Sequence, residues 1–442
     1  MRHLRARRCS AAGLVALALS TTLTVSASAP ATAANDGHWW FDAYGIQAIH
    51  DEGWTGAGVK IAVIDSNINP DLPVFAGRNL TVDPRPLCAD ATSVTTTATT
   101  EGAVHGTTVV AQIIGSGQGP DGIEGIAPGA EVTFYSMGTR TQDGVCTSAE
   151  YGDELTPLAL GVQRAIDDGA AIIISSIAGG TASSDSDVIA NAIAKGIMLV
   201  GSGPNPSTVS FTGLREYRGV VVASAVDATG RLAELDDGQP LVYSGTTVVA
   251  PGQGMATVGS EGKSWDTVAT GSGSSFSAPL VAGMLALSAQ RYPTATASQI
   301  VQALLRNTGD KPHDLFNDAA SGYGYGLAWP SRMVSDDPTA YPDENLLLDS
   351  ESGKPTAAQI EAAATRGSGF PPSTVTIDTS SETPVPRGAD EAPSASTSAA
   401  GLALIIVGAV LAIVLVGGGV TAAVVVASRK RARKATSDDR SV

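Results

Sequence analysis

Short apolar runs alternate with amphipathic segments through the middle of the chain. Continuous apolar runs of this length are typical of parallel strands that helices cover on both faces. The segments between them have apolar residues at helical spacing and end close to a glycine, a common helix C-cap. This alternation predicts an α/β fold with a mostly parallel central sheet, in which ligands bind beyond the carboxyl ends of the strands. The predicted strands are 59–65, 171–176, 197–202 and 219–225, and the clearest predicted helices are 156–170 and 185–196.

Two further apolar stretches lie near the ends of the chain. Residues 11–23 follow four arginines and precede small residues, a pattern typical of a secretory signal peptide, which we assign to 1–34. Residues 399–428 carry no charge and exceed the ~20 residues that span a bilayer, so they are predicted to form a transmembrane helix. The basic tail 429–442 that follows is expected in the cytoplasm by the positive-inside rule. We therefore predict a single-pass protein of the cell membrane whose main domain lies outside the cytoplasm.

The segment before the predicted span has a different composition. Residues 334–398 are rich in Pro, Ser, Thr and acidic residues and contain few aromatic ones. Such a segment buries too little apolar surface to offset its chain entropy. We interpret it as a flexible stalk, which leaves 35–333 as the folded domain.

Charge and cysteine content narrow the function. The chain has a net charge of −16, and because both ends are basic the exported part is more acidic still. Such a surface repels nucleic acid, so no nucleic-acid partner is expected. Cys9 falls in the signal peptide, which leaves Cys88 and Cys146 in an oxidising compartment. A disulfide between two surface loops is the simplest expectation, and two free buried thiols are the alternative.

Metal binding is not indicated by the sequence. There is no CxxC motif and no cluster of Cys and His, so no zinc site is expected. Acidic residues such as Asp185 and Asp187 are interpreted as solvated surface. We therefore predict no metal and no cofactor.

Three polar residues lie at the ends of predicted elements. Asp65 ends the strand 59–65, His105 opens a predicted helix, and Ser275 precedes Pro279 in the predicted first turn of another. Acyl transfer needs a hydroxyl nucleophile, an imidazole that takes its proton and a carboxylate that orients the imidazole. Each residue taken singly is more often a cap, a surface group or a loop residue. Their order along the chain, Asp, His and Ser, is one of the orders found in such triads.

The segments around these residues resemble those of one family. "AVIDSNI" contains Asp65, "HGTTVVAQIIG" begins at His105, and "GSSFSAPLVAG" contains Ser275. Together they resemble the subtilisin-like serine proteases, peptidase family S8, over about residues 38–333. The resemblance implies a three-layer subtilisin-like fold and a serine endopeptidase that cleaves polypeptide substrates. It also implies that Ser275 is the nucleophile among four nearby serines, His105 the general base and Asp65 the orienting acid.

Two further sites follow from the same resemblance. "GIMLVGSGPN" places Asn205 where the family has its oxyanion-hole asparagine, although Pro204 replaces the preceding glycine. "ISSIAGG" stands where the family lines its substrate cleft, so Ser176, Ile177 and Ala178 are predicted cleft residues. Ala178 replaces a glycine and is expected to reshape the pocket.

The arrangement of segments resembles one branch of the family. Between the predicted signal peptide and the domain there is no room for a separately folded propeptide. Together with the stalk, the single span, the basic tail and the cysteine pair, this resembles the mycosins, the membrane-anchored proteases of actinobacterial type VII secretion systems. The resemblance implies a type VII membrane complex as partner, which the protein would stabilise and whose substrates it would process. Two alternatives stay open, a structural subunit with dispensable catalysis and a general cell-surface protease.

Overall fold

The structure is a computed structural model that describes residues 36–140, 145–177, 180–208, 212–309, 311–348 and 353–365. The predicted signal peptide 1–34, the span 399–428, the tail 429–442 and most of the predicted stalk lie outside these residues. Within the described ranges, none of the helices has the length and apolar character that crossing a bilayer requires.

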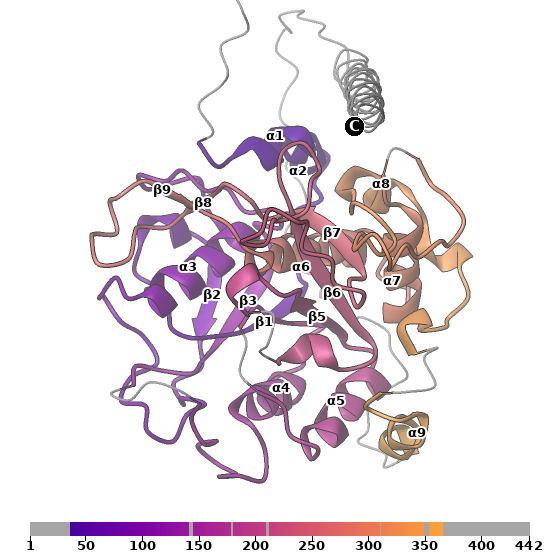
Figure 1. Cartoon of the computed structure of the whole chain (residues 1–442), viewed down its shortest axis with the longest axis horizontal. Helices are drawn as coiled ribbons and strands as arrows, with labels where there is room; N and C mark the ends of the chain where they lie inside the picture. Colours follow the sequence, from indigo (N-terminus) through magenta and orange to yellow (C-terminus); the bar gives the residue numbers. More distant parts are fainter. Residues whose placement is uncertain are drawn as a thin grey trace, which may run out of the picture. The chain divides into compact units, whose positions relative to one another are not determined.

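A seven-stranded parallel sheet forms the centre of the described domain (Figure 1). Its strand order is β2-β3-β1-β4-β5-β6-β7, and every neighbouring pair is parallel. The four predicted strands are all present, as β1, β4, β5 and β6, which confirms the α/β prediction. The sheet strands are β1 (Lys60–Asp65), β2 (Asn79–Val82), β3 (Glu131–Ser136), β4 (Ile172–Ser175), β5 (Met198–Ser202), β6 (Val220–Val226) and β7 (Val248–Pro251), and an antiparallel ribbon pairs β8 (Met255–Thr257) with β9 (Ala269–Gly271).

Helices cover both faces of the sheet. Successive residues of β1 show why: Ile61 and Val63 face one apolar core, and Ala62 and Ile64 face the other. The first core is shared with α3 and α6, and the second with α4 and α5, so the fold has three layers (Figure 1). The helices are α1 (Trp39–Ala43), α2 (Ile46–Asp51), α3 (Glu101–Ile114), α4 (Pro157–Asp167), α5 (Asp185–Ala194), α6 (Ser274–Arg291), α7 (Ala297–Arg306), α8 (Pro330–Ser335) and α9 (Ala357–Thr365), with short 3-10 turns η1 (Pro73–Phe75), η2 (Pro206–Thr208), η3 (Leu214–Glu216), η4 (Pro338–Ala340) and η5 (Leu346–Leu348).

Two helices begin earlier than the sequence pattern predicts. The Thr100 side chain caps α3 by accepting a hydrogen bond from the Ala103 N–H, so His105 lies in the second turn rather than at the start. Helix α6 begins at Ser274, and Pro279 therefore lies inside the helix rather than in its first turn. Proline has no N–H to donate to the preceding turn. The Ser275 carbonyl consequently lacks its usual intrahelical partner.

The folded domain extends past the predicted boundary at residue 333, so the predicted stalk begins too early. Residues 334–348 and 353–365 contain η4, η5 and α9, and α9 packs against α5. The Arg218 N–H donates to the Lys354 carbonyl at 2.7 Å, and Gln359 Nε2 donates to Asp187 Oδ1 at 3.0 Å. The amino-acid composition did not predict that this segment is folded, because hydrogen bonds to the rest of the domain hold much of it in place. Such bonds leave no apolar pattern in the sequence.

Asp185 is buried, so its interpretation as solvated surface is wrong. Its side chain is 1% exposed and accepts four hydrogen bonds. The donors are the Thr156 N–H and hydroxyl at 3.0 and 2.9 Å, the Ala182 N–H at 2.8 Å and the Tyr217 hydroxyl at 3.1 Å. This carboxylate therefore ties the start of α4 to the start of α5.

Replacing this carboxylate should destabilise the domain. In Asp185→Ala four donors lose their acceptor inside the protein, so we expect the free energy of unfolding to fall by about 3 kcal/mol. The matched control is Asp187→Ala, two residues further along the same helix. The Asp187 side chain is exposed and accepts one hydrogen bond, so the free energy of unfolding should fall by less than about 1 kcal/mol. Urea unfolding of both variants in a Ser275→Ala background measures the difference, and equal losses would contradict the structural role of Asp185.

Candidate active site

Asp65 lies at the carboxyl end of β1, in the middle of the sheet. Its side chain is fully buried, and Oδ1 accepts hydrogen bonds from the Ser66 N–H at 2.7 Å and from His105 Nδ1 at 2.9 Å. Strands β3 and β4 flank β1 and pair with it along its length. The position of the carboxylate is therefore set by the most constrained part of the sheet.

His105 reaches the acid from α3. A Cβ atom at the next residue, Gly106, would lie 2.3 Å from the Asn67 carbonyl oxygen and 3.3 Å from Asp65 Oδ1. The glycine therefore lets α3 approach the loop after β1. Because Nδ1 donates to the carboxylate, the neutral ring carries its proton there, and Nε2 is left as the proton acceptor. The side chain is 23% exposed, so the ring is open on one side.

Opposing effects act on the pKa of His105. Burial alone would lower the pKa of the imidazole. The charge of Asp65, the hydrogen bond to it and the charge of Glu101 outweigh burial and raise the pKa above its ordinary value of 6.5. The imidazolium is thus stabilised where an acyl-transfer reaction would form it.

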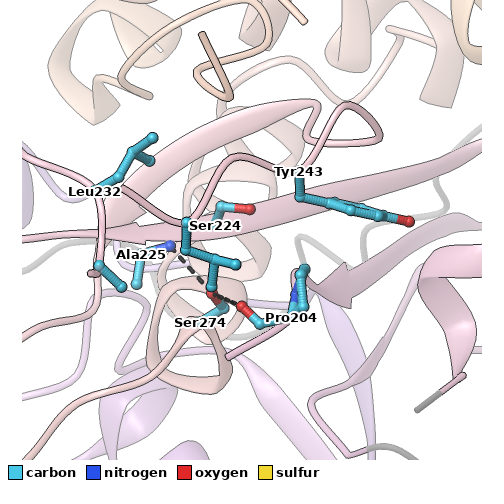
Figure 2. A pocket seen from close by; sticks show the side chains of 8 residues that line it. Pro204, Ser224, Ala225, Leu232, Tyr243 and Ser274 are labelled. Carbon is cyan, nitrogen blue, oxygen red and sulfur yellow. Dashed lines mark hydrogen bonds between the residues drawn. The ribbon is translucent and has the colours of Figure 1, made fainter. Parts of the chain in front are cut away.

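Ser275 differs from the serines around it. Ser272 accepts from the Gly254 N–H, Ser277 donates to the Ala250 carbonyl, and Ser274 donates to the Pro204 carbonyl and accepts from the Ala225 N–H. Figure 2 shows the two Ser274 bonds, beside a small pocket that Leu232 and Tyr243 help to line. Within the described ranges, the Ser275 hydroxyl makes no hydrogen bond. It is therefore the hydroxyl that is not committed to supporting the loop.

The side chains of Asn205 and Ser275 both lie close to Gly273. Asn205 Oδ1 accepts from the Ser274 N–H at 2.7 Å, which fixes the plane of the side-chain amide. A Cβ atom at Gly273 would lie 3.1 Å from Asn205 Nδ2 and 3.2 Å from Ser275 Oγ. The structure thus brings an amide donor and the uncommitted hydroxyl to the same point at the start of α6. Pro204 does not prevent this, because its carbonyl accepts from Ser274 and holds the turn in place.

Phe276, which directly follows Ser275 in the chain, contacts His105. The Phe276 ring stacks against the His105 ring, with 6.2 Å between ring centroids and 28° between planes. No hydrogen bond joins Ser275 Oγ to His105 in the part of the chain that the structure describes. Hydrogen bonds between catalytic groups are often long before substrate binds. Gly106, Gly273 and Phe276 were not singled out from the sequence, although all three lie within the quoted motifs.

The predicted cleft residues follow β4. Ser176 is buried and its carbonyl accepts from the Ser202 hydroxyl at 3.3 Å, whereas Ile177 is half-buried. Ala178, the predicted departure from the family, lies outside the described residues. After this gap the Gly180 N–H donates to the Thr212 carbonyl at 3.2 Å. Ser202 and Thr212 are therefore additional residues near this segment.

A disulfide joins Cys88 and Cys146, whose Cα atoms are 5.6 Å apart. It links the loop after β2 to the loop after β3. The predicted disulfide between two loops is therefore present, and the Cys88 side chain is buried within its loop. The loop after β3 also contains Thr139, whose hydroxyl accepts from Asn67 Nδ2 at 2.7 Å. The crosslink therefore braces a loop that contacts the segment just after Asp65.

Potential metal ligands cluster near the disulfide. In the described ranges, one group of three potential ligands lies close enough to share an ion, and it consists of Cys88, Cys146 and Asp90. Both sulfur atoms of this group are bonded to each other. The arrangement of Asp65, His105, Ser275 and Asn205 instead contains the parts needed for acyl transfer, namely nucleophile, base, orienting acid and oxyanion donor.

Comparison with known proteins agrees with this geometry. The model of the Subtilase family, Peptidase_S8, matches residues 56–326. The chain is 27% identical over 299 residues to a thermostable alkaline protease of Halalkalibacterium halodurans, covering 67% of this chain and 73% of that protein. It is 29% identical over 272 residues to subtilisin E of Bacillus subtilis, covering 58% of this chain and 63% of the relative. The minor extracellular protease Epr of B. subtilis is longer still, and the match spans 48% of it.

Solved structures share the fold at lower identity. Fervidolysin from Fervidobacterium pennivorans, a keratinolytic enzyme related to subtilisin, matches with a TM-score of 0.52 and 24% identity, covering 67% of this chain and 45% of that one. MycP1 from the ESX-1 type VII secretion system matches with a TM-score of 0.50 and 21% identity, covering 69% and 87%. At these identities the likeness concerns the fold alone.

Removing the Asp65 charge should lower the pKa of His105. In Asp65→Asn the desolvation of the ring remains while its main counter-charge is lost, so the pKa should fall below that of the unsubstituted protein. Glu101→Gln is the matched control, with a smaller change in the same direction, because Glu101 contributes least of the groups that raise the pKa. NMR titration of ¹³C-labelled histidine in a Ser275→Ala background measures both. An unchanged or higher His105 pKa in Asp65→Asn would contradict the assignment.

Proposed function

Because the chain belongs to the subtilase family of serine endopeptidases, we propose that Ser275, His105 and Asp65 form its catalytic triad. The observation that carries this assignment is the hydrogen bond from His105 Nδ1 to Oδ1 of the fully buried Asp65, together with a Ser275 hydroxyl that makes no hydrogen bond among the described residues. It leaves Nε2 of the partly exposed His105 ring as the proton acceptor.

In the acylation step, Ser275 Oγ attacks the carbonyl carbon of the scissile peptide bond. His105 Nε2 takes the hydroxyl proton as the bond forms, and Asp65 stabilises the resulting imidazolium. When the tetrahedral intermediate collapses, His105 returns this proton to the leaving amine, and the acyl group stays on Ser275. A water molecule then repeats the sequence, and its proton passes through His105 while the acyl bond is hydrolysed.

The oxyanion of each tetrahedral intermediate needs donors close to Ser275. The Ser275 N–H lies in the first turn of α6, where the N–H groups have no intrahelical acceptor. Asn205 Nδ2 is the second donor, oriented by the bond that Oδ1 accepts from Ser274. One such donor contributes about 3 kcal/mol of transition-state stabilisation in related sites.

The reaction requires neutral His105, which sets the acid limit of activity. Because the His105 pKa is raised, activity should rise with pH through a midpoint above 6.5. The contribution of His105 to folding stability has the opposite pH dependence and decreases as pH rises. Protonation of His105 stabilises the folded state fully below the unfolded-state pKa, and this contribution is lost as pH rises through the folded-state pKa.

We further propose that the domain is anchored to the cell membrane and works at a type VII secretion complex. The supporting observations are the signal-like segment 1–34, the apolar segment 399–428 and the basic tail 429–442. The fold likeness to MycP1, which comes from such a system, is consistent with this role. The substrates would be polypeptides exported beside the complex.

The triad assignment is tested with a fluorophosphonate probe, which reacts with activated serines. The folded wild type should be labelled and should hydrolyse peptide substrates, and Ser275→Ala should do neither. The matched control is Ser277→Ala, which removes a neighbouring hydroxyl that donates to Ala250 and should leave labelling at Ser275 in place. In Asn205→Ala labelling should persist while kcat falls about 100-fold. Absence of labelling in folded wild type would show that the subtilisin fold is retained as a structural subunit.

The secretion role is tested by copurification from detergent-solubilised membranes. Both the wild type and Ser275→Ala should copurify with type VII membrane components, because binding does not require the nucleophile. A chain without residues 399–442 should leave the membrane fraction. Active protein that copurifies with no such component in either form would identify a general cell-surface protease instead.

A further inference from the structure

Phe276 places its ring on the face of His105. It directly follows Ser275 in the first turn of α6, and its side chain is 7% exposed. The 6.2 Å centroid separation and 28° interplanar angle describe an offset stack, which lies within the range of favourable ring pairs. Asp65 holds one edge of the imidazole, and Phe276 covers one of its faces.

The surrounding structure makes room for this ring. A Cβ atom at Gly271 of β9 would lie 3.0 Å from Phe276 Cε2 and 3.2 Å from Thr257 Cγ2 of β8. The absence of a side chain at Gly271 therefore lets the ribbon close over the aromatic ring. With the ribbon on one side and α6 behind it, Phe276 has little freedom to leave the imidazole.

We propose that Phe276 is a positioning residue for catalysis, which holds the His105 ring in plane and stabilises its protonated form through the aromatic face. This inference rests on the proposed triad. A ring on one face prevents the imidazole from rotating away from the line between Asp65 and Ser275. When His105 takes the serine proton, the negative face of the phenyl ring attracts the new charge.

The other charges near His105 are few. Asp65 on β1 and Glu101, one turn earlier on α3, both favour the imidazolium. The first turn of α6, with the sequence SSFS, contributes no titratable side chain, and neither do β8 and β9, with the sequences MAT and ATG. In the first turn of α6, Phe276 is therefore the side chain that can affect the protonation equilibrium of His105.

The test changes the ring while keeping an apolar side chain. In Phe276→Leu and Phe276→Met the acid dissociation constant of His105 should rise about two- to fivefold, because the stabilisation of the imidazolium is lost. Phe276→Tyr keeps the aromatic face, so the acid dissociation constant of His105 should stay unchanged within the error of the titration. The measurement is ¹³C-histidine NMR on the full chain in detergent, in the Ser275→Ala background. The His105 resonance is identified by its loss in His105→Gln.

Kinetics on the active enzyme provide the second readout. Phe276→Leu should lower kcat about tenfold and move the acid limb of the pH profile downward, with KM within about twofold. Phe75→Leu removes a buried ring from η1 that makes no ring contact with a histidine among the described residues, and it controls for general loss of packing.

The outcomes separate this inference from the triad assignment. An unchanged His105 titration in both folded Phe276 variants, or an equal shift in Phe75→Leu, would overturn the positioning role. If the wild type is inactive and unlabelled while the Phe276 variants still shift the His105 titration, the proposed catalytic triad is wrong. The effect of the Phe276 ring on His105 is then still supported. If only one of the two Phe276 variants folds, its titration alone decides, because both lack the aromatic face.

Discussion

The buried carboxylate of Asp65 is the group on which the arrangement of the site depends. A buried charge needs hydrogen-bond donors or an opposite charge, and here the Ser66 N–H and His105 Nδ1 supply both hydrogen bonds to Oδ1, whereas Oδ2 has no partner among the described residues. This requirement fixes the tautomer of His105 and holds α3 close to the end of β1. Gly106 is part of the same constraint, because any side chain there would push the helix away from the acid.

The nucleophile depends on a second set of contacts, which are almost all made by its neighbours. Ser274 and Ser277 anchor the first turn of α6 to the Pro204 and Ala250 carbonyls, and Asn205 accepts from the Ser274 N–H. Because these bonds hold the backbone, the Ser275 hydroxyl does not have to contribute to stability. The Ser275 hydroxyl thus stays available for reaction because the neighbouring serine hydroxyls make the stabilising hydrogen bonds. The same turn of α6 brings the Phe276 ring against His105.

Parts of the molecule far from the reacting atoms support the same edge of the sheet. The disulfide joins the loops after β2 and β3, and Thr139 in the second loop contacts Asn67 just after the acid. On the opposite face of the sheet, Asp185 ties α4 to α5, and the segment 353–365 packs along α5. These contacts restrain α4 and α5, the helices that follow β3 and β4. They thereby also restrain the carboxyl ends of these strands, beside which the predicted cleft residues lie.

The sequence alone determined four of the seven strands of the sheet, the order Asp65, His105 and Ser275, and the choice of Ser275 among four serines. These follow from local periodicity and from motifs of fixed spacing, which a linear chain contains in full. The tertiary structure decided where α3 and α6 begin, that Asp185 and Cys88 are buried, and that the domain continues to Thr365. It also placed Phe276 on His105 and brought Asn205 and Ser275 together beside Gly273. Such facts depend on contacts between residues that are distant in the chain, and no local pattern specifies which distant side chain will meet a given group.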